Sequence, residues 1–271
     1  MRPTLSIMLG LVCCAAFSAG QTADELVAKN LQAKGGIEKI KAITTQVSTG
    51  KLQQGQFQAR VGQEAKAPDL MRQTFTIQGM TAIQAYDGNT GWQISPFEGR
   101  KDPELLGEDD LRDIVEQADF YGPLVDYKEK GNTIDYLGHD SVDGDDVYKL
   151  RVTLKNGDIL NYYLDPDSML EIRVEKIMYI RGAVHESVQD LGSYKQVNGV
   201  YFPFSMENGQ RNSPQRAKIT IDSLKVNVPI EDSQFKMPAA PVLPSPQKHE
   251  EPTEQKKVQP KPPEAKKPPK N

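Results

Sequence analysis

The amino-acid sequence predicts a mainly β fold with a few helices, in which an antiparallel meander forms one strongly curved sheet or a partly closed barrel. Many short segments alternate apolar and polar residues, as half-buried strands do. Two dipeptides, Asn156-Gly157 and Asn198-Gly199, are hairpin signals, because tight hairpin turns need positive φ. Nine or more strands joined in sequence form a meander, and open twisted sheets of that length tend to curl. Helices are expected to fill the open side.

Residues 1–20 have the layout of a secretory signal peptide, with Arg2 before an apolar run and small residues before Gly20. The chain is therefore predicted to be secreted. The alternative is an N-terminal core helix. Both cysteines, Cys13 and Cys14, lie in this segment, so a chain cut after Gly20 contains neither a disulfide nor a cysteine metal site. A lipid-anchored form through Cys14 is a second alternative, although the residues before it fit that signal poorly.

The segment that follows is predicted to begin with helix and then turn to strands. Residues 22–33 carry an apolar stripe behind Thr22 or Asp24 as cap, and Gly35-Gly36 ends the helix. A second short helical turn is expected near 37–43. In the stretch 108–120, apolar residues recur on one helical face behind three acidic residues. The first group of predicted strands covers 45–53, 56–61, 70–78, 81–86 and 91–94, and one more helical turn is expected at 124–130.

The second half of the domain gives the clearest strand pattern. Its turns are Asn156-Gly157, 165–168, Arg181-Gly182 and Asn198-Gly199. These turns predict strands at 147–154, 159–164, 170–180, 184–194, 200–206 and 218–226. Residues 21–237 are thus expected to form one β-rich domain.

Residues 238–271 are predicted to be a disordered tail. They contain ten prolines and many Lys and Glu residues, but no aromatic residue. Such a segment cannot bury enough apolar surface to offset the entropy of ordering. It is either a spacer or partner ligand, or a solvated tail without a specific partner.

Composition and motifs argue against several functions. The chain has 271 residues and a net charge of −4, so it lacks the basic balance of a nucleic-acid-binding protein. A mean hydropathy of −0.58 excludes a protein with several membrane spans. Phosphate-binding loops, nucleophile elbows and zinc-protease motifs are missing, so no cofactor is predicted. The acidic stretch 138–146 around His139 lacks the ligand spacing of a calcium loop and is better explained as a surface turn.

A curved sheet with a helical cover can leave an apolar cavity at its mouth. The only Trp, Trp92, follows a turn and stands near Ile94 and Phe97, which could line the rim of such a cavity. Ordinary core packing is the alternative explanation for each of them. The candidate ligand-binding residues are Phe75, Ile77, Tyr86, Trp92, Ile94, Phe97, Leu111, Ile114 and Val115.

Several segments, taken in order, resemble the LolA family of periplasmic lipoprotein carriers and the larger LolA-like outer membrane lipoprotein-sorting proteins. The likeness runs from about residue 23 to residue 237. It rests on the opening 33–40, the stretch 85–92 with Pro96-Phe97-Glu98, Tyr148-Lys149-Leu150 with Asn156-Gly157, Tyr163-Leu164-Asp165-Pro166, and 195–200 with Phe202-Pro203.

The resemblance implies an unclosed antiparallel barrel covered by helices, with a hydrophobic cavity for acyl chains. One position departs from the family pattern. Ala67 stands where the carriers have a basic residue tied to cargo release, and Lys66 precedes it.

The function expected from these observations is a non-enzymatic, monomeric periplasmic carrier or binding protein for acyl chains of lipoproteins or other lipids. It would meet partner proteins at the inner or outer membrane. An envelope-stress sensor or scaffold that binds proteins through the same fold and its tail is the second hypothesis. A hydrolase that uses an Asp/Glu pair is the third, because carboxylates are plentiful.

Overall fold

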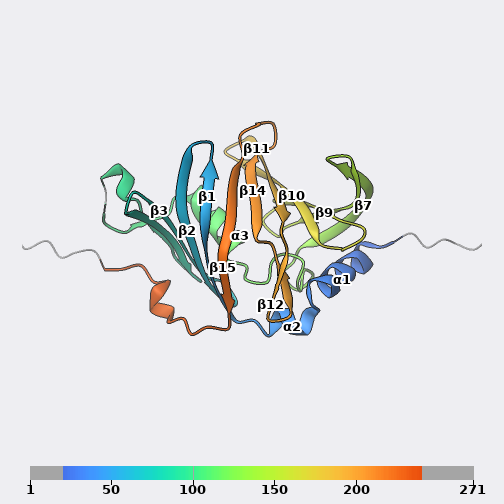
Figure 1. The fold of residues 1–271 in the computed structure, drawn as a ribbon, viewed down its shortest axis with the longest axis horizontal. Helices are drawn as coiled ribbons and strands as arrows, with labels where there is room; N and C mark the ends of the chain where they lie inside the picture. Colours follow the sequence, from blue (N-terminus) through green and yellow to red (C-terminus); the bar gives the residue numbers. More distant parts are fainter. Residues whose placement is uncertain (1–20, 100, 240–271) are drawn as a thin grey trace, which may run out of the picture. The chain divides into compact units, whose positions relative to one another are not determined.

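The computed structural model describes residues 21–99 and 101–239, and this part of the chain is built around one antiparallel sheet of 13 strands (Figure 1). The strand order is β6-β5-β4-β3-β2-β1-β15-β14-β11-β10-β9-β8-β7. The sheet is therefore not closed, since β6 and β7 are its two edges. The predicted mainly β, unclosed antiparallel fold is confirmed.

The first half of the sheet is a meander in which every strand pairs with the next. Its strands are β1 (Thr45–Gln54), β2 (Phe57–Lys66), β3 (Leu70–Ile77), β4 (Met80–Asp87), β5 (Gly91–Ile94) and β6 (Glu104–Leu105). The second half holds β7 (Thr133–Val142), β8 (Asp145–Thr153), β9 (Ile159–Leu164), β10 (Glu171–Ile180), β11 (Ala183–Gly192), β14 (Ser205–Gln210) and β15 (Ala217–Val226), and β12 (Lys195–Val197) with β13 (Val200–Phe202) forms a separate hairpin.

The two halves join where β1 pairs with β15, so the first strand of the domain lies beside the last. The register shifts at Thr49 and Gly50, which marks a bulge. A Cβ atom on Gly50 would lie 2.3 Å from the carbonyl oxygen of Thr220. Glycine is therefore needed for the close approach of the two backbones at this seam.

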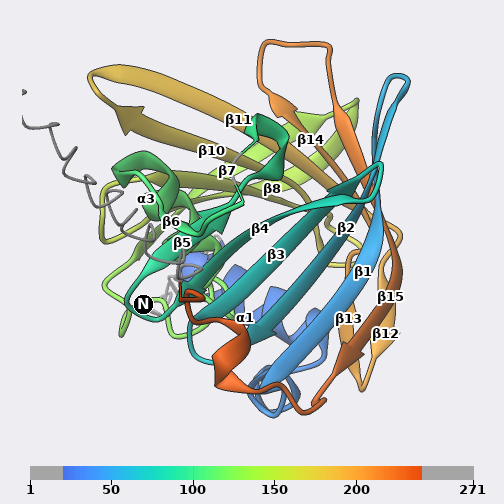
Figure 2. The same ribbon diagram turned by 90° about the vertical axis from the view of Figure 1, so that its left-hand side faces the viewer.

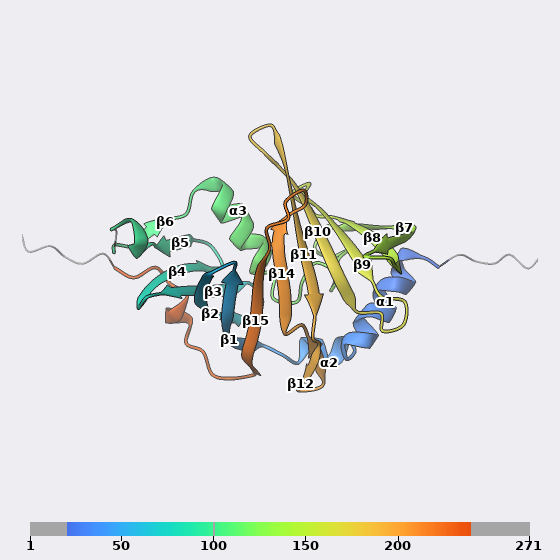
Figure 3. The same ribbon diagram turned by 45° about the horizontal axis from the view of Figure 1, so that its top comes forward.

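Three helices pack against the sheet: α1 (Ala23–Lys34), α2 (Ile37–Lys41) and α3 (Glu108–Gln117). The side chain of Thr22 accepts a hydrogen bond from the Glu25 amide, and the Glu25 carboxylate accepts one from the Thr22 amide. Thr22 is thus the cap of α1. Figure 3 shows α1 beside β9 and α3 near the middle of the sheet. Two short 3-10 helices, η1 (Pro96–Glu98) and η2 (Asp232–Gln234), complete the elements of the described residues.

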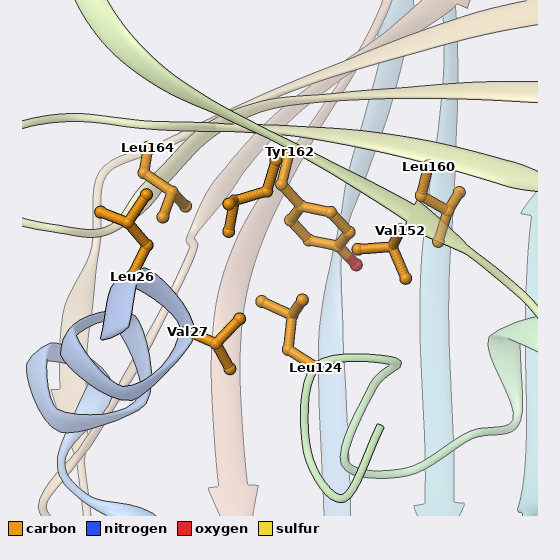
Figure 4. Packing of buried hydrophobic residues seen from close by; sticks show 8 residues of the cluster. Leu26, Val27, Leu124, Val152, Leu160, Tyr162 and Leu164 are labelled. Atoms are coloured by element: carbon orange, nitrogen blue, oxygen red, sulfur yellow. The ribbon is translucent and has the colours of Figure 1, made fainter. Parts of the chain in front are cut away.

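The largest buried cluster lies between α1 and the second half of the sheet. Leu26 and Val27 point from α1 toward the inner side chains of β8 and β9, and Leu124 approaches from the loop after α3 (Figure 4). The cluster consists of Leu26, Val27, Leu124, Leu150, Val152, Leu160, Tyr162 and Leu164. Burial of this apolar surface is what holds α1 on the sheet.

Three segments differ from the sequence-based expectation. Residues 133–142 form the edge strand β7, which was not predicted, and the acidic stretch 138–146 is the end of β7 and its hairpin with β8. Asp143 and Gly144 form that turn with positive φ. Residues 124–130 form hydrogen-bonded turns and no helix. The strand expected at 200–206 is divided into β13 and β14, which belong to different sheets.

The segment after β15 runs across the outer face of the first half of the sheet (Figure 2). The Thr45 hydroxyl donates to the carbonyl oxygen of Val228 at 2.6 Å, and Lys66 forms an ion pair with Asp232 at 2.6 Å. Farther along, the Trp92 indole donates to the carbonyl oxygen of Phe235 at 2.7 Å. These contacts fasten the segment to β1, β2 and β5.

None of the helices in residues 21–99 and 101–239 has the length and apolar character needed to cross a membrane.

Candidate functional site

The inner face of the sheet, on the side of α3, contains an open cavity of about 620 Å³. Its walls come from β1 to β5, from β11, β14 and β15, and from the last residue of α3. All of the residues that line it are uncharged. They are Ser48, Gly50, Leu52, Val61, Gly62, Gln63, Met71, Gln73, Thr74, Phe75, Ala82, Ile83, Gln84, Gln93, Ile94, Ser95, Gln117, Gln189, Met206, Asn208, Ile219 and Ile221.

An apolar band forms one part of the cavity wall. Val61, Phe75 and Ala82 are direct cross-strand neighbours on β2, β3 and β4, so their side chains share one face. The Phe75 ring stacks on the Phe57 ring, with 6.0 Å between the ring centroids. It meets the Phe97 ring edge to face, with 6.1 Å between the centroids. Phe97 is 40% exposed and lies at the rim. This band is an apolar surface that a hydrocarbon chain can contact.

A row of four glutamines forms the neighbouring part of the wall. Gln63, Gln73, Gln84 and Gln93 lie opposite one another on four successive strands, β2 to β5. The Gln73 amide donates to Gln117 of α3 at 2.8 Å, which places the row on the face that α3 covers. Two strand positions separate this row from the apolar band, so both lie on the same face of the sheet. The cavity therefore combines apolar contact with neutral hydrogen-bonding groups.

A second cavity of about 570 Å³ adjoins the first and shares Gln117, Gln189, Met206 and Asn208 with it. In contrast to the first, it contains ion pairs. Lys176 of β10 lies 2.6 Å from Asp113 and 2.9 Å from Glu116, both on α3. Burial raises the pKa of Glu116, and Lys176 only partly offsets this effect. These pairs hold α3 over the sheet between the two cavities.

The other charged pair of the second cavity joins α1 to β10. Lys34 Nζ lies 3.0 Å from the carboxylate of Glu171, whose side chain is 4% exposed. The Tyr194 hydroxyl donates to the backbone carbonyl of Glu171 at 2.7 Å. Burial acts to raise the pKa of Glu171, but Lys34 and hydrogen bonds from the backbone and Asn30 together outweigh it, so this pKa lies below its ordinary value. The pair is a structural link between helix and sheet.

The structure divides the nine predicted site residues among several places. Phe75 and Ile94 border the uncharged cavity, and Phe97 touches Phe75 at its rim. Ile77 lies beside a separate surface groove at the β3–β4 turn. Val115 is 42% exposed on α3. Tyr86, Leu111 and Ile114 lie in a buried cluster between α3 and the strands β3 and β4. The cluster also contains Met71, Leu106 and Ala118.

Trp92 lies away from the cavity. Trp92 precedes Gln93 on β5, so its side chain lies on the opposite face of the sheet from the glutamine row. On that outer face its indole donates a hydrogen bond to the carbonyl oxygen of Phe235. The side chain is 2% exposed, and Phe235 is fully buried. Sequence position beside a turn could not reveal this, because the contact joins residues 143 positions apart.

Sequence reasoning missed the glutamine row and the wall from β14 and β15. A signal for the row was present in the positions of the turns. Each of the turns near residues 68, 79 and 89 has one of these glutamines before it and one after it, at nearly equal distances along the sequence. Residues spaced in this way about a hairpin turn lie opposite each other on the two strands. The contribution of β14 and β15 depends on the long-range pairing of β1 with β15, which no local pattern encodes.

Two other expected features have clear places in the structure. Ala67 lies in the turn between β2 and β3, and the neighbouring Lys66 is engaged by Asp232 and by the Ile230 carbonyl. His139 contacts Asp146 across the β7–β8 hairpin at 2.7 Å. Within the described residues, acidic, histidine and cysteine side chains do not gather in groups of three or more that could hold a metal ion.

Comparisons with known proteins agree on the fold and not on a sequence family. No family model and no curated protein matches this sequence. Among solved structures, a DUF1329 family protein from Desulfovibrio piger aligns with a TM-score of 0.56 at 14% identity, over 79% of this chain and 97% of that one. A LolA superfamily protein from Nitrosomonas europaea gives 0.56 at 13% identity, over 80% and 98%.

A third solved structure points the same way. A protein domain named for outer membrane lipoprotein sorting, from Vibrio parahaemolyticus, aligns with a TM-score of 0.53 at 13% identity, over 78% of this chain and 94% of that one. At these identities the likeness concerns the fold. The chain has a LolA-like fold.

Proposed function

We propose that this LolA-like chain is a non-catalytic binding protein or carrier for acyl chains, of lipoproteins or of other lipids, in the periplasm. The observation that carries the proposal is the uncharged cavity on the inner face of the sheet, with its apolar band around Phe75. Each methylene that leaves water for such a surface contributes about 0.8 kcal/mol. A chain of a dozen carbons therefore supplies enough free energy for retention without a covalent bond or a cofactor.

Two further observations support this function. The fold is shared with a LolA superfamily protein and with a protein domain named for outer membrane lipoprotein sorting. The N-terminal segment has the sequence of a secretory signal, which would deliver the chain to the periplasm. The charged groups beside the cavity are engaged with one another in ion pairs, as Lys176 with Asp113 and Glu116 shows. Such paired groups have a structural explanation and do not require a catalytic one.

The proposal is tested by analysing what the protein carries. The chain is secreted through its own signal, purified without detergent, extracted with organic solvent and examined by mass spectrometry. We expect acyl-containing material in near-stoichiometric amount. Val61→Glu, which places a carboxylate in the uncharged wall, should lower the acyl content at least about tenfold, because burial of an unpaired charge is costly. Leu52→Glu provides a second variant at the same wall.

The matched control is Val184→Glu, because Val184 is an exposed valine on β11 outside this cavity. It should carry as much acyl material as the unmodified protein, while circular dichroism shows that all variants are folded. Equal acyl content in the Val61 and Leu52 variants would contradict the proposal. So would an unmodified protein that is empty and takes up no fluorescent acyl probe, and that outcome would favour a protein-binding module.

A further inference from the structure

The two adjoining cavities differ in charge, although they share part of one wall. The second cavity contains Lys34, Asp113, Glu116, Glu171 and Lys176. The first contains no ionisable side chain among the residues that line it. Any charged group of a ligand in the first cavity would therefore lack a direct counter-charge on its walls.

The first cavity nevertheless offers unused hydrogen-bonding capacity. Gln63 and Gln84 occupy the glutamine row beside Gln73, and their side-chain amides have no hydrogen-bond partner among the described residues. Gln73 and Gln93, by contrast, donate to Gln117 and Glu104. Each free amide presents two N–H donors and one carbonyl acceptor. The wall thus presents donors and acceptors together, and no net charge.

We infer that the cavity selects acyl chains joined to an uncharged polar group, with acylglycerol esters as the ligand class, and that Gln63 and Gln84 bind this group. The inference rests on the proposed function and names the ligand chemistry of the same site. The apolar band of Val61, Phe75 and Ala82 lies directly beside the row. One ligand can therefore place its chain on the band and its ester and hydroxyl groups against the amides.

A free fatty acid fits the same wall less well when it is ionised. A carboxylate only accepts hydrogen bonds, so it would accept them from the amide N–H groups of the glutamines. The carbonyl oxygens of the same glutamines would gain no donor from it and would repel its negative charge. It would also lose water without gaining a cation. An acylglycerol accepts bonds through its ester carbonyl and donates through its hydroxyls, which matches both ends of an amide.

The test compares two ligands with the same chain, monododecanoylglycerol and dodecanoate, by titration calorimetry on the full secreted protein. At about pH 8 we expect the ester to bind at least about tenfold more tightly, since an unpaired buried charge opposes binding. The affinity for dodecanoate should rise as the pH falls, because the cavity favours its protonated form.

Gln63→Leu combined with Gln84→Leu keeps the approximate size of both side chains and removes the amides. This variant should bind monododecanoylglycerol about tenfold more weakly, the loss expected for two hydrogen bonds, and the preference over dodecanoate should narrow. Gln196→Leu is the control, because Gln196 lies exposed in β12 and outside both cavities. Its affinities should equal those of the unmodified protein.

The outcomes separate the inference from the proposed function. If dodecanoate binds as tightly as the ester, or if the double variant keeps full affinity for the ester, the inference is wrong while acyl binding stands. If neither ligand binds, the proposed function itself fails. Mass spectrometry of the natural extract then identifies the source, since a free acylglycerol and a lipoprotein-linked chain differ by the attached peptide.

Discussion

Lys34 is the main group that favours the ionised form of the buried Glu171 carboxyl. Lys34 Nζ lies 3.0 Å from it, and the pKa of Glu171 lies below its ordinary value although burial acts in the opposite direction. A carboxyl group whose pKa is lowered on folding stabilises the fold above its ordinary pKa. This stabilisation is lost as the pH falls through the lowered pKa. The link between α1 and β10 should therefore weaken in acid.

Lys34→Met tests this link. It leaves Glu171 buried without a cation, which should raise the pKa of that carboxyl and lower the free energy of unfolding by about 2 kcal/mol at neutral pH. The difference from the unmodified protein should shrink as the pH falls and vanish below the lowered pKa of Glu171, where this carboxyl is protonated in both proteins. Urea unfolding at several pH values measures the effect.

Lys29→Met provides the comparison on the same helix, since Lys29 is exposed. It should change the free energy of unfolding by less than about 0.5 kcal/mol at every pH. A Lys34 variant whose destabilisation is equally large in acid would show that the lost contact is not electrostatic.

Charged pairs are a large part of the attachment of α3 to the sheet. Lys176, with a side chain only 14% exposed, joins it through Asp113 and Glu116, and the half-buried Arg112 pairs with the buried Asp158. The pKa of Lys176 is raised, because the two acidic residues outweigh the opposite effect of burial. On its other side α3 makes apolar contacts through Leu111 and Ile114. Its position over the cavities thus depends on both kinds of contact.

Lys176→Met should loosen α3 specifically. Glu116 would remain in a site where burial already raises its pKa, without the cation that favours its charged form. We expect the backbone amides of residues 108–117 to exchange with deuterium about tenfold faster, measured by mass spectrometry of peptides. Lys149→Met, which removes a lysine paired with Asp140 on the second half of the sheet, is the control. Equal exchange of α3 in the two variants would contradict the assigned role.

Elements were predictable from the sequence wherever a local pattern determines them. Thr22 and Glu25 mark the start of α1, and Asn156-Gly157 marks a hairpin, because capping and tight turns involve neighbouring residues. The edge strand β7 was missed, since most of its residues are exposed and its apolar alternation, Ile134 and Tyr136, is short. At the candidate site, the apolar strand pattern pointed to Phe75 and Ile94, which border the cavity. The glutamines were missed, because a polar strand residue normally indicates solvent.

The molecule as a whole depends on two contacts between distant parts of the sequence. The seam of β1 with β15 joins the two halves of the sheet into one curved surface, and both halves contribute to the cavity wall. The segment after β15 then crosses the outer face, and the carbonyl of its buried Phe235 accepts a hydrogen bond from the buried Trp92 indole. A curved sheet with one face covered by helices leaves part of its other face open. This segment covers that face where Trp92 would otherwise meet water.

The segment after β15 should therefore be part of the folding unit, whereas the proline-rich residues beyond it should not be. A chain that ends at Ala239 should keep the denaturation midpoint of the full chain, because 240–271 have the composition of a solvated tail. A chain that ends at Val226 loses the burial of Phe235, worth about 3–5 kcal/mol, and leaves the Trp92 N–H without its acceptor. Trp92 is the only tryptophan, so its fluorescence should shift to the red as it becomes exposed.

Phe235→Ala separates these effects if the shorter chain does not fold. It keeps the backbone acceptor of Trp92 but removes the buried ring, so it should lower the free energy of unfolding by about 3 kcal/mol and shift the emission less than the truncation does. Unfolding in urea, followed by tryptophan fluorescence and by circular dichroism, measures all three proteins. If the chain that ends at Val226 were as stable as the one that ends at Ala239, the outer segment would have no structural role. The inner cavity would then be supported by the sheet and its helices alone.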